Sequence, residues 1–237
     1  MTHPRFLIVN ADDFGLSQGI NRGILHAHEH GIVTSASLMV RWPAASEAAA
    51  LAGTHPRLSV GLHVDMGEWV FRDGEWTLLY EVLPPDASHA DIGAEAQRQL
   101  GAFREIIGKN PTHIDSHQHV HRDEPLRSIL AAFCAEMEIP LRSFSPAVSY
   151  RGDFYGRTGK GEPYPDPITV AGLLQLLTSL EPGVTELGCH PGLGEDFDSV
   201  YRAERALEVG TLCDPQVRDA IVAETITLGS FCDAPAR

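Results

Sequence analysis

The stretch HIDSHQHVH, residues 113–121, places four histidines and one aspartate within nine positions. Imidazole rings at this density can bind a metal ion, transfer protons, or lie in a solvated loop that happens to be rich in histidine. If the segment is extended, His117, His119 and His121 share one face, which is too polar to bury without a partner. Asp115 could then orient one of these rings through its carboxylate.

Three other segments carry side chains of the same chemical kind. They are Asp12 and Asp13 after an apolar run, His63 in VGLHVD, and His190 in CHPG. Taken alone, each has an ordinary explanation, because paired aspartates are common in turns and a histidine between apolar neighbours can belong to the core. Each segment, however, follows a predicted strand, and the carboxyl ends of parallel strands share one rim. We therefore predict that these residues form one site with residues 113–121.

The composition of this group favours metal-assisted hydrolysis. One aspartate with two histidines suits Zn, Mn, Fe or Co, and three protein ligands leave coordination positions open for water and substrate. Such a metal activates water and polarises a carbonyl oxygen, while a free carboxylate and a further histidine can serve as base and acid. By contrast, His26 and His30 lie on one face of a predicted helix without an evident third ligand, and we expect them at a wet surface.

The elements that would position these groups alternate between strands and helices. Strands are predicted at residues 5–10, 32–40, 58–64, 112–115, 139–144, 184–189 and 225–228. Helices are predicted at residues 17–30, with Ser17 as the N-cap, and at 44–52, 90–107, 125–137, 169–180, 199–212 and 215–223. Asp73-Gly74 predicts a small hairpin, and residues 149–167 predict a loop. Repeated βα units indicate one α/β domain over residues 1–237 with a parallel sheet, closed as a barrel or left open.

Composition limits the class of protein. Among 237 residues, 43% apolar and 21% charged are ordinary values for a globular protein, and neither a targeting segment nor a membrane span is evident. The net charge of −14 argues against nucleic acid as a partner, because no surplus of Lys and Arg can neutralise phosphates. The four cysteines lie far apart and suggest neither a zinc knuckle nor a disulfide framework. We expect a cytoplasmic enzyme without membrane contact; homo-oligomerisation stays open.

Five motifs, in this order along the chain, resemble those of the YdjC-like carbohydrate deacetylases, the family that includes chitooligosaccharide deacetylase. They are NADDFGLSQGINRGI, GIVTSASLMV, VGLHVD, PTHIDSHQHVH and TELGCHPG. The resemblance implies an irregular (β/α) barrel of TIM type. It also implies a metal-dependent enzyme that hydrolyses the N-acetyl group of a small amino-sugar or oligosaccharide substrate and releases acetate.

Carried over onto this sequence, the resemblance implies a role for each matched residue. Asp13, His63 and His117 would bind one divalent metal ion. Asp12 would be the general base, and His190 would donate a proton to the leaving amine. Four further residues are candidates for contacts to the substrate or to the ligands: Asp115, His119, His121 and Arg142. The metal stays open, because the family suggests Mg²⁺ whereas two imidazoles suit Zn²⁺.

Two segments depart from the family pattern, MGEWVFRDGEWTLLY and YGRTGKGEPYPDP. They would form lid loops on the active rim, where loops select the substrate, and their aromatic residues could stack on a sugar or pack as lid hydrophobics. The charged stretch YRAER, residues 201–205, looks like any solvated helix face, and we assign no role to it. Two alternatives stay open: a metal-dependent hydrolase of another amide, ester or phosphate, and a catalytically silent sugar- or metal-binding regulator. A GxxxxGK[ST] phosphate cradle is absent, and binding alone would need neither Asp12 nor His190.

Overall fold

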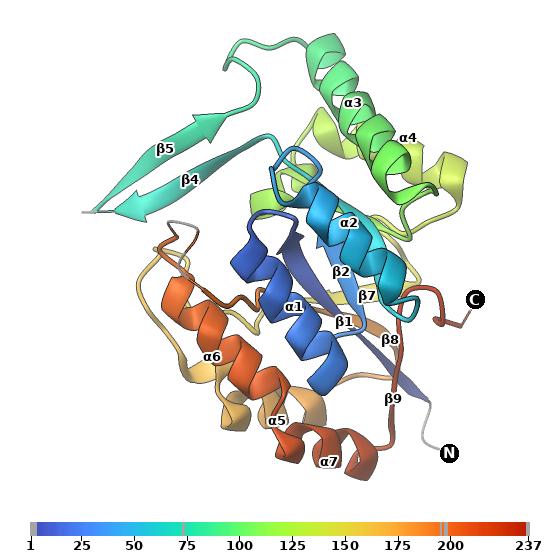
Figure 1. Cartoon of the computed structure of the whole chain (residues 1–237), viewed down its shortest axis with the longest axis vertical. Helices are drawn as coiled ribbons and strands as arrows, with labels where there is room; N and C mark the ends of the chain where they lie inside the picture. Colours follow the sequence, from blue (N-terminus) through green and yellow to red (C-terminus); the bar gives the residue numbers. More distant parts are fainter. Residues whose placement is uncertain (1–3, 73, 195, 197–198, 236–237) are drawn as a thin grey trace.

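A parallel sheet forms the centre of the molecule (Figure 1). The computed structural model describes residues 4–72, 74–194, 196 and 199–235. The strands of this sheet are β1 (Arg5–Phe14), β2 (Ser35–Leu38), β3 (Ser59–Val64), β6 (Ile114–Ser116), β7 (Val148–Arg151), β8 (Gly183–Cys189) and β9 (Ile226–Leu228). Their order is β6-β3-β2-β1-β8-β7, with β9 also paired to β1, and every one of these pairings is parallel. The carboxyl ends of the strands therefore share one rim.

The sheet is curled into a half-barrel rather than closed. Over the described ranges, β6 and β7 are the two ends of the strand order and do not pair with each other. The α/β class predicted from the sequence is confirmed. A complete barrel of TIM type, which the family resemblance implied, is not what this sheet forms.

Helices pack outside the sheet, with α1 and α2 in front of it in Figure 1. They are α1 (Gln18–His30), α2 (Ala45–Thr54), α3 (His89–Ile107), α4 (Leu126–Met137), α5 (Val170–Thr178), α6 (Arg202–Leu212) and α7 (Pro215–Ala223), with the short 3₁₀ helices η1 (His117–Arg122) and η2 (Asp166–Ile168). The hydroxyl of Ser17 accepts the amide of Ile20 at 3.2 Å, so the predicted N-cap of α1 is confirmed. None of these helices combines the length and the apolar character needed to cross a membrane.

Two predicted connections are wrong. Residues 139–144 do not form a strand, because Leu141 makes one isolated bridge to Ile114 and Ser143 then turns the chain with a φ of 66°. The edge strand β7 lies instead at the start of the segment predicted as a loop, where it pairs with β8. Its half-exposed residues lack the apolar run of the central strands, so the pattern alone did not indicate it.

A second, two-stranded sheet projects from the main one (Figure 1). It consists of β4 (Gly67–Arg72) and β5 (Glu75–Glu81), which pair antiparallel. The pairing shifts register between Glu68 and Trp69, as a bulge does when it re-aims side chains. Asp73, half of the predicted Asp73-Gly74 turn, lies outside the described residues.

The core beneath the rim contains a neutral histidine, His113. Burial lowers the pKa of its ring to about 3. Its Nε2 lies 3.0 Å from the hydroxyl of Ser37, and its ring stacks on Phe231 with centroids 3.8 Å apart. The third close neighbour is Gly61 in β3, where an added Cβ would lie 2.4 Å from Cε1 of His113. This ring therefore fills a space that only a glycine leaves open.

We expect Gly61→Ala to lower the free energy of unfolding by about 1–3 kcal/mol, because the new methyl group overpacks a ring that is held on two sides. Urea denaturation measures the change. Gly101→Ala is the matched control: it lies in α3 with no atom within 4 Å of the added Cβ, and it should leave stability unchanged or raise it by up to about 1 kcal/mol. A Gly61→Ala protein as stable as wild type would contradict this packing.

Candidate metal centre and active site

The strand ends bring the predicted polar residues together. Asp12 and Asp13 lie near the end of β1, His63 in β3, Asp115 in β6, His117 at the start of η1, and His190 directly after β8. Most of them line a pocket of about 810 Å³, which also receives side chains from the β4–β5 hairpin and from residues 150–161. The shared rim predicted from the sequence is present.

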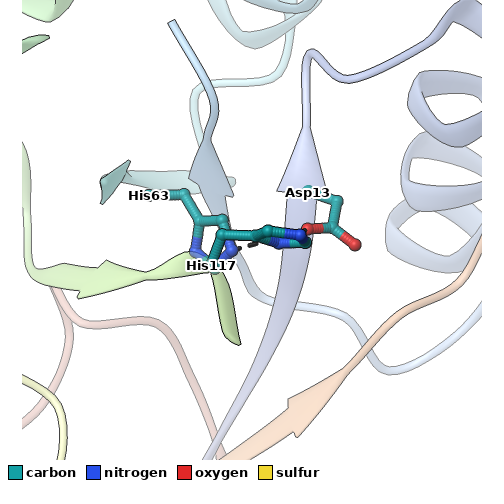
Figure 2. A group of neighbouring side chains, drawn as sticks. All are labelled: Asp13, His63 and His117. Atoms are coloured by element: carbon teal, nitrogen blue, oxygen red, sulfur yellow. Dashed lines mark hydrogen bonds and ion pairs between the residues drawn. The ribbon is translucent and has the colours of Figure 1, made fainter. Parts of the chain in front are cut away.

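Asp13, His63 and His117 converge on one point (Figure 2). Oδ1 of Asp13 lies 3.1 Å from Nδ1 of His117 and 3.4 Å from Nε2 of His63. Asp13 adopts a φ of 66°, in the left-handed region that residues with a Cβ rarely occupy. Such strain is concentrated at functional sites, and here it accompanies the convergence of the three side chains.

This group fits a metal ion by its chemistry. A carboxylate oxygen and two imidazole nitrogens lie within 4.8 Å of one another, and the set leaves coordination positions free. The far nitrogen of His63, Nδ1, lies 2.7 Å from Oδ1 of Asp115, the arrangement in which a carboxylate orients a metal-binding histidine. Nε2 of His117 is buried without a hydrogen-bond partner in the described structure. Asp115 thus lies where the sequence analysis expected a residue that orients a ring.

The electrostatics of the group are those of a site that holds positive charge. Burial opposes charge on both histidines, but Asp115 and Asp13 raise the pKa of His63 to about 10, and Asp13 and Glu68 raise the pKa of His117 to about 9. Burial likewise opposes ionisation of Asp13, yet Arg205, 2.5 Å from Oδ2, and the two histidines hold its pKa well below the usual range.

Asp12 points into a separate ion-pair network around Arg142. Both its oxygens bind the guanidinium, at 2.6 and 2.7 Å, and Arg142 also contacts Asp115 and Glu186. Burial opposes ionisation of Asp12, but Arg142 outweighs it and lowers the pKa. Asp12, His63 and Asp115 form a second group of possible metal ligands, but both of its carboxylates already contact the cation of Arg142. Arg142 therefore holds the carboxylates of Asp12 and Asp115 in position without lining the pocket itself.

His190 lies beside Asp12, with Nε2 3.8 Å from Oδ2. The rings of Tyr155 and Tyr201 pack against its ring at centroid distances of 5.4 and 5.7 Å. Its backbone amide donates to Glu208, which also accepts the hydroxyl of Tyr201. Burial lowers the pKa of His190 to about 4, and Arg205 and Arg142 act in the same direction, so the ring is neutral near pH 7.

The histidines that follow His117 do not share one face as expected. The segment is the 3₁₀ helix η1, not an extended chain, and Gln118 and His119 have φ values of 50° and 56°. His119 lines the pocket beside Tyr150, whereas His121 is buried with Nδ1 2.7 Å from the hydroxyl of Ser116. His119 therefore faces the pocket, whereas His121 ties η1 to the end of β6 through Ser116.

Sequence reasoning missed several charged residues. The stretch YRAER, to which the sequence analysis gave no role, contains two of them: Glu204 and Arg205 are buried, and Arg205 binds Asp13. Glu186 in β8 and Glu208 in α6 are also buried; Glu186 accepts a hydrogen bond from Arg142, and Glu208 accepts one from the backbone amide of His190. In β8 the motif TELG puts Glu186 between apolar neighbours, a signal that could have indicated a buried carboxylate. His26 and His30 are exposed, as expected.

A family model described as YdjC-like protein matches residues 6–223. The chain belongs to the YdjC-like family. The resemblance drawn from the five motifs is thereby confirmed. Over 95% of both chains, this YdjC-like protein is 36% identical to a carbohydrate deacetylase of Geobacillus stearothermophilus. It is 32% identical to a chitooligosaccharide deacetylase of Serratia marcescens, over 97% of this chain and 99% of the other.

Solved structures share its fold. A candidate cellobiose-phosphate cleavage protein from Enterococcus faecalis V583 matches 98% of this YdjC-like chain and all of its own, with a TM-score of 0.76 at 24% identity. A family 4 carbohydrate esterase from Streptomyces lividans, in complex with acetate, covers 100% of this chain with 98% of its own, with a TM-score of 0.59 at 12% identity. At these identities the likeness shows the fold alone, a curled parallel sheet with a barrel-like course.

Metal binding is expected to release protons. With pKa values raised to about 10 and about 9, His63 and His117 are protonated in the metal-free protein near pH 7, whereas coordination needs an unprotonated nitrogen. Binding of Zn²⁺ should release one or two protons and should tighten from about pH 6 to about pH 8, by up to roughly 100-fold per unit if both rings lose a proton. Calorimetry in buffers of different ionisation enthalpy counts these protons. Binding without proton release, or binding that weakens as pH rises, would contradict these charge states.

Proposed function

We propose that this YdjC-like protein is a metal-dependent carbohydrate deacetylase that removes the N-acetyl group of an amino sugar or oligosaccharide. The observation that carries the proposal is the convergence of Asp13, His63 and His117 beside the Asp12–His190 pair at the wall of one pocket. The two relatives named above, a carbohydrate deacetylase and a chitooligosaccharide deacetylase, support the reaction type and the substrate class.

In this proposal Asp13, His63 and His117 hold one divalent cation. When bound there, the cation supplies Lewis acidity toward water and toward the acetyl carbonyl oxygen. The family association suggests Mg²⁺, but two imidazole ligands to one carboxylate favour Zn²⁺ or a similar transition metal.

Asp12 is the proposed general base. Because its pKa is lowered, it is a carboxylate throughout the neutral range and can accept a proton from the attacking water. Its two contacts to Arg142 and the amide of Asn10, which donates to Oδ1 at 2.9 Å, fix the direction of its oxygens. Because the carboxylate is already oriented, it loses less conformational entropy on reaching the transition state than an exposed aspartate would.

His190 is the proposed proton donor to the leaving amine. Its ring is neutral at rest, so it must first receive a proton before it can give one away. Oδ2 of Asp12 lies 3.8 Å from Nε2 of His190, a short path for the proton taken from water. The proton then reaches the nitrogen of the breaking C–N bond, which leaves as an amine while the acetyl group leaves as acetate.

The pocket suits a carbohydrate. A volume of about 810 Å³ exceeds the needs of one acetyl group, and the aromatic rings of Trp69, Trp76, Tyr150 and Tyr155 lie along its wall. Trp69 and Trp76 are 47% and 58% exposed, so their faces are available to a ring rather than packed inside the lid.

The substrate class is tested by incubation with N-acetylated mono- and oligosaccharides. We expect free acetate and a new primary amine in equal amounts, and loss of both when a chelator removes the metal. Enzymatic assay of acetate and derivatisation of the amine measure the two products. A panel of acetyl sugars that yields no acetate, alongside simple phosphate esters that are cleaved, would favour a different hydrolase.

Substitutions of Asp12 and of Asp13 are expected to have different effects on metal content and turnover. Asp12→Asn keeps the size of the side chain but cannot accept a proton, so turnover should fall by about 10²–10⁴-fold with near-normal metal content. Asp13→Asn removes the only carboxylate of the proposed ligand set and should lower metal content and turnover together. Elemental analysis and steady-state kinetics of both purified variants measure this. If Asp12→Asn lost the metal and Asp13→Asn kept it, the two assignments would be reversed.

A further inference from the structure

The side chain of Gln118 fastens the β4–β5 hairpin to the segment that carries His117. Its amide nitrogen donates to the carbonyl oxygen of Trp69 at 2.6 Å, and its carbonyl oxygen accepts the amide of Trp69 at 2.9 Å. A side-chain amide thus pairs with the backbone of β4 in both directions, as a neighbouring strand would. These two hydrogen bonds join a residue of η1 to a residue of the separate small sheet.

The backbone around this contact is strained. Gln118 and His119, directly after His117, both have left-handed φ values, although neither is a glycine. On the hairpin side, the register of β4 and β5 shifts between Glu68 and Trp69. Both partners therefore depart from regular geometry at the point where they meet.

The same register shift brings a carboxylate to His117. Oε2 of Glu68 lies 3.7 Å from Nε2 of His117, the buried nitrogen that has no hydrogen-bond partner in the described structure. The other nitrogen, Nδ1, faces Asp13. His63 has a carboxylate on its far nitrogen, that of Asp115, and Glu68 occupies the corresponding place for His117.

We propose that Glu68 is a positioning residue that orients His117 for the metal. We further propose that Gln118 brings Glu68 to His117 by binding the backbone of the hairpin at Trp69. A small movement of the Glu68 side chain closes the 3.7 Å gap to a hydrogen bond and fixes the tautomer in which Nδ1 is free to coordinate. The inference rests on the metal-binding part of the proposed function.

The hairpin also carries Trp69, Phe71 and Trp76, which line the pocket. One element therefore presents aromatic surface to the substrate and a carboxylate to a metal ligand. Because the coupling is thermodynamic, whatever holds the hairpin down should strengthen metal binding, and metal should hold the hairpin down in return.

The test is the affinity of the metal-free full chain for Zn²⁺ alone, measured in competition with a chromogenic chelator. Glu68→Ala and Gln118→Ala should each weaken binding by about 10–100-fold, the range for lost orienting contacts. Glu68→Gln, which can still accept a hydrogen bond, should lose less. Glu75→Gln removes the same charge from an exposed position on the same hairpin and should bind as wild type does.

Two further readouts separate positioning from a general loss of structure. In hydrogen exchange, Gln118→Ala should speed exchange over residues 67–72, and Zn²⁺ should slow it in wild type. In the double variant, Glu68→Ala with Gln118→Ala should bind Zn²⁺ no more weakly than the worse single variant, because both act through one contact. Effects that multiply would overturn the link between docking and His117.

The outcomes distinguish this inference from the proposed function. If wild type binds Zn²⁺ tightly and Glu68→Ala binds it equally well, the role of Glu68 is overturned while the metal centre stands. If only Gln118→Ala is unaffected, docking through Gln118 is overturned. If wild type binds neither Zn²⁺ nor another divalent ion, both proposals fall together.

Discussion

Three carboxylates meet the buried guanidinium of Arg142, those of Asp12, Asp115 and Glu186, at 2.6, 2.6 and 2.7 Å. They come from β1, β6 and β8, so three strands of the sheet carry charges that would repel one another without this cation. One positive charge does not balance three negative ones, and burial raises the pKa of Glu186 to about 7 despite the contact. His63, whose pKa is raised to about 10, adds a second positive charge 2.7 Å from Asp115.

Arg142 is connected to the rest of the site through two of the carboxylates that it binds. One of them, Asp12, lies beside His190 in the pocket. The other, Asp115, contacts Nδ1 of His63. Asp13 is connected differently: its left-handed backbone accompanies a side chain paired with Arg205 on α6 and with His117. Two consecutive aspartates thus have separate cations, which is the physical basis for giving them separate functions.

The sequence predicted the parts of the site that the sheet positions. Asp13, His63 and His190 follow from strand ends, because parallel strands place their carboxyl ends on one rim whatever the helices between them do. Arg205 could not be predicted, since it lies on a helix where charged residues usually face water, and its burial depends on tertiary contact with Asp13. The sequence left open whether the sheet closes as a barrel, and it wrongly predicted a strand at residues 139–144, where Leu141 makes one isolated bridge and Ser143 then turns the chain.

The irregular contacts between the β4–β5 hairpin and η1 could not be predicted either. Strand periodicity predicts which face of β3 or β8 is buried, but it carries no information on a left-handed turn such as Gln118–His119 or on the bulge at Trp69. These irregular contacts place the hairpin and its aromatic side chains beside the strand ends that carry Asp12, Asp13 and His63. The proposed reacting groups thus lie on the regular parallel sheet. The aromatic residues proposed to contact the sugar lie mainly on the irregular hairpin. Under the proposed function, substitutions in the hairpin would therefore change substrate choice, while the Asp12–Arg142 and Asp13–Arg205 pairs would keep the proposed reacting groups in place.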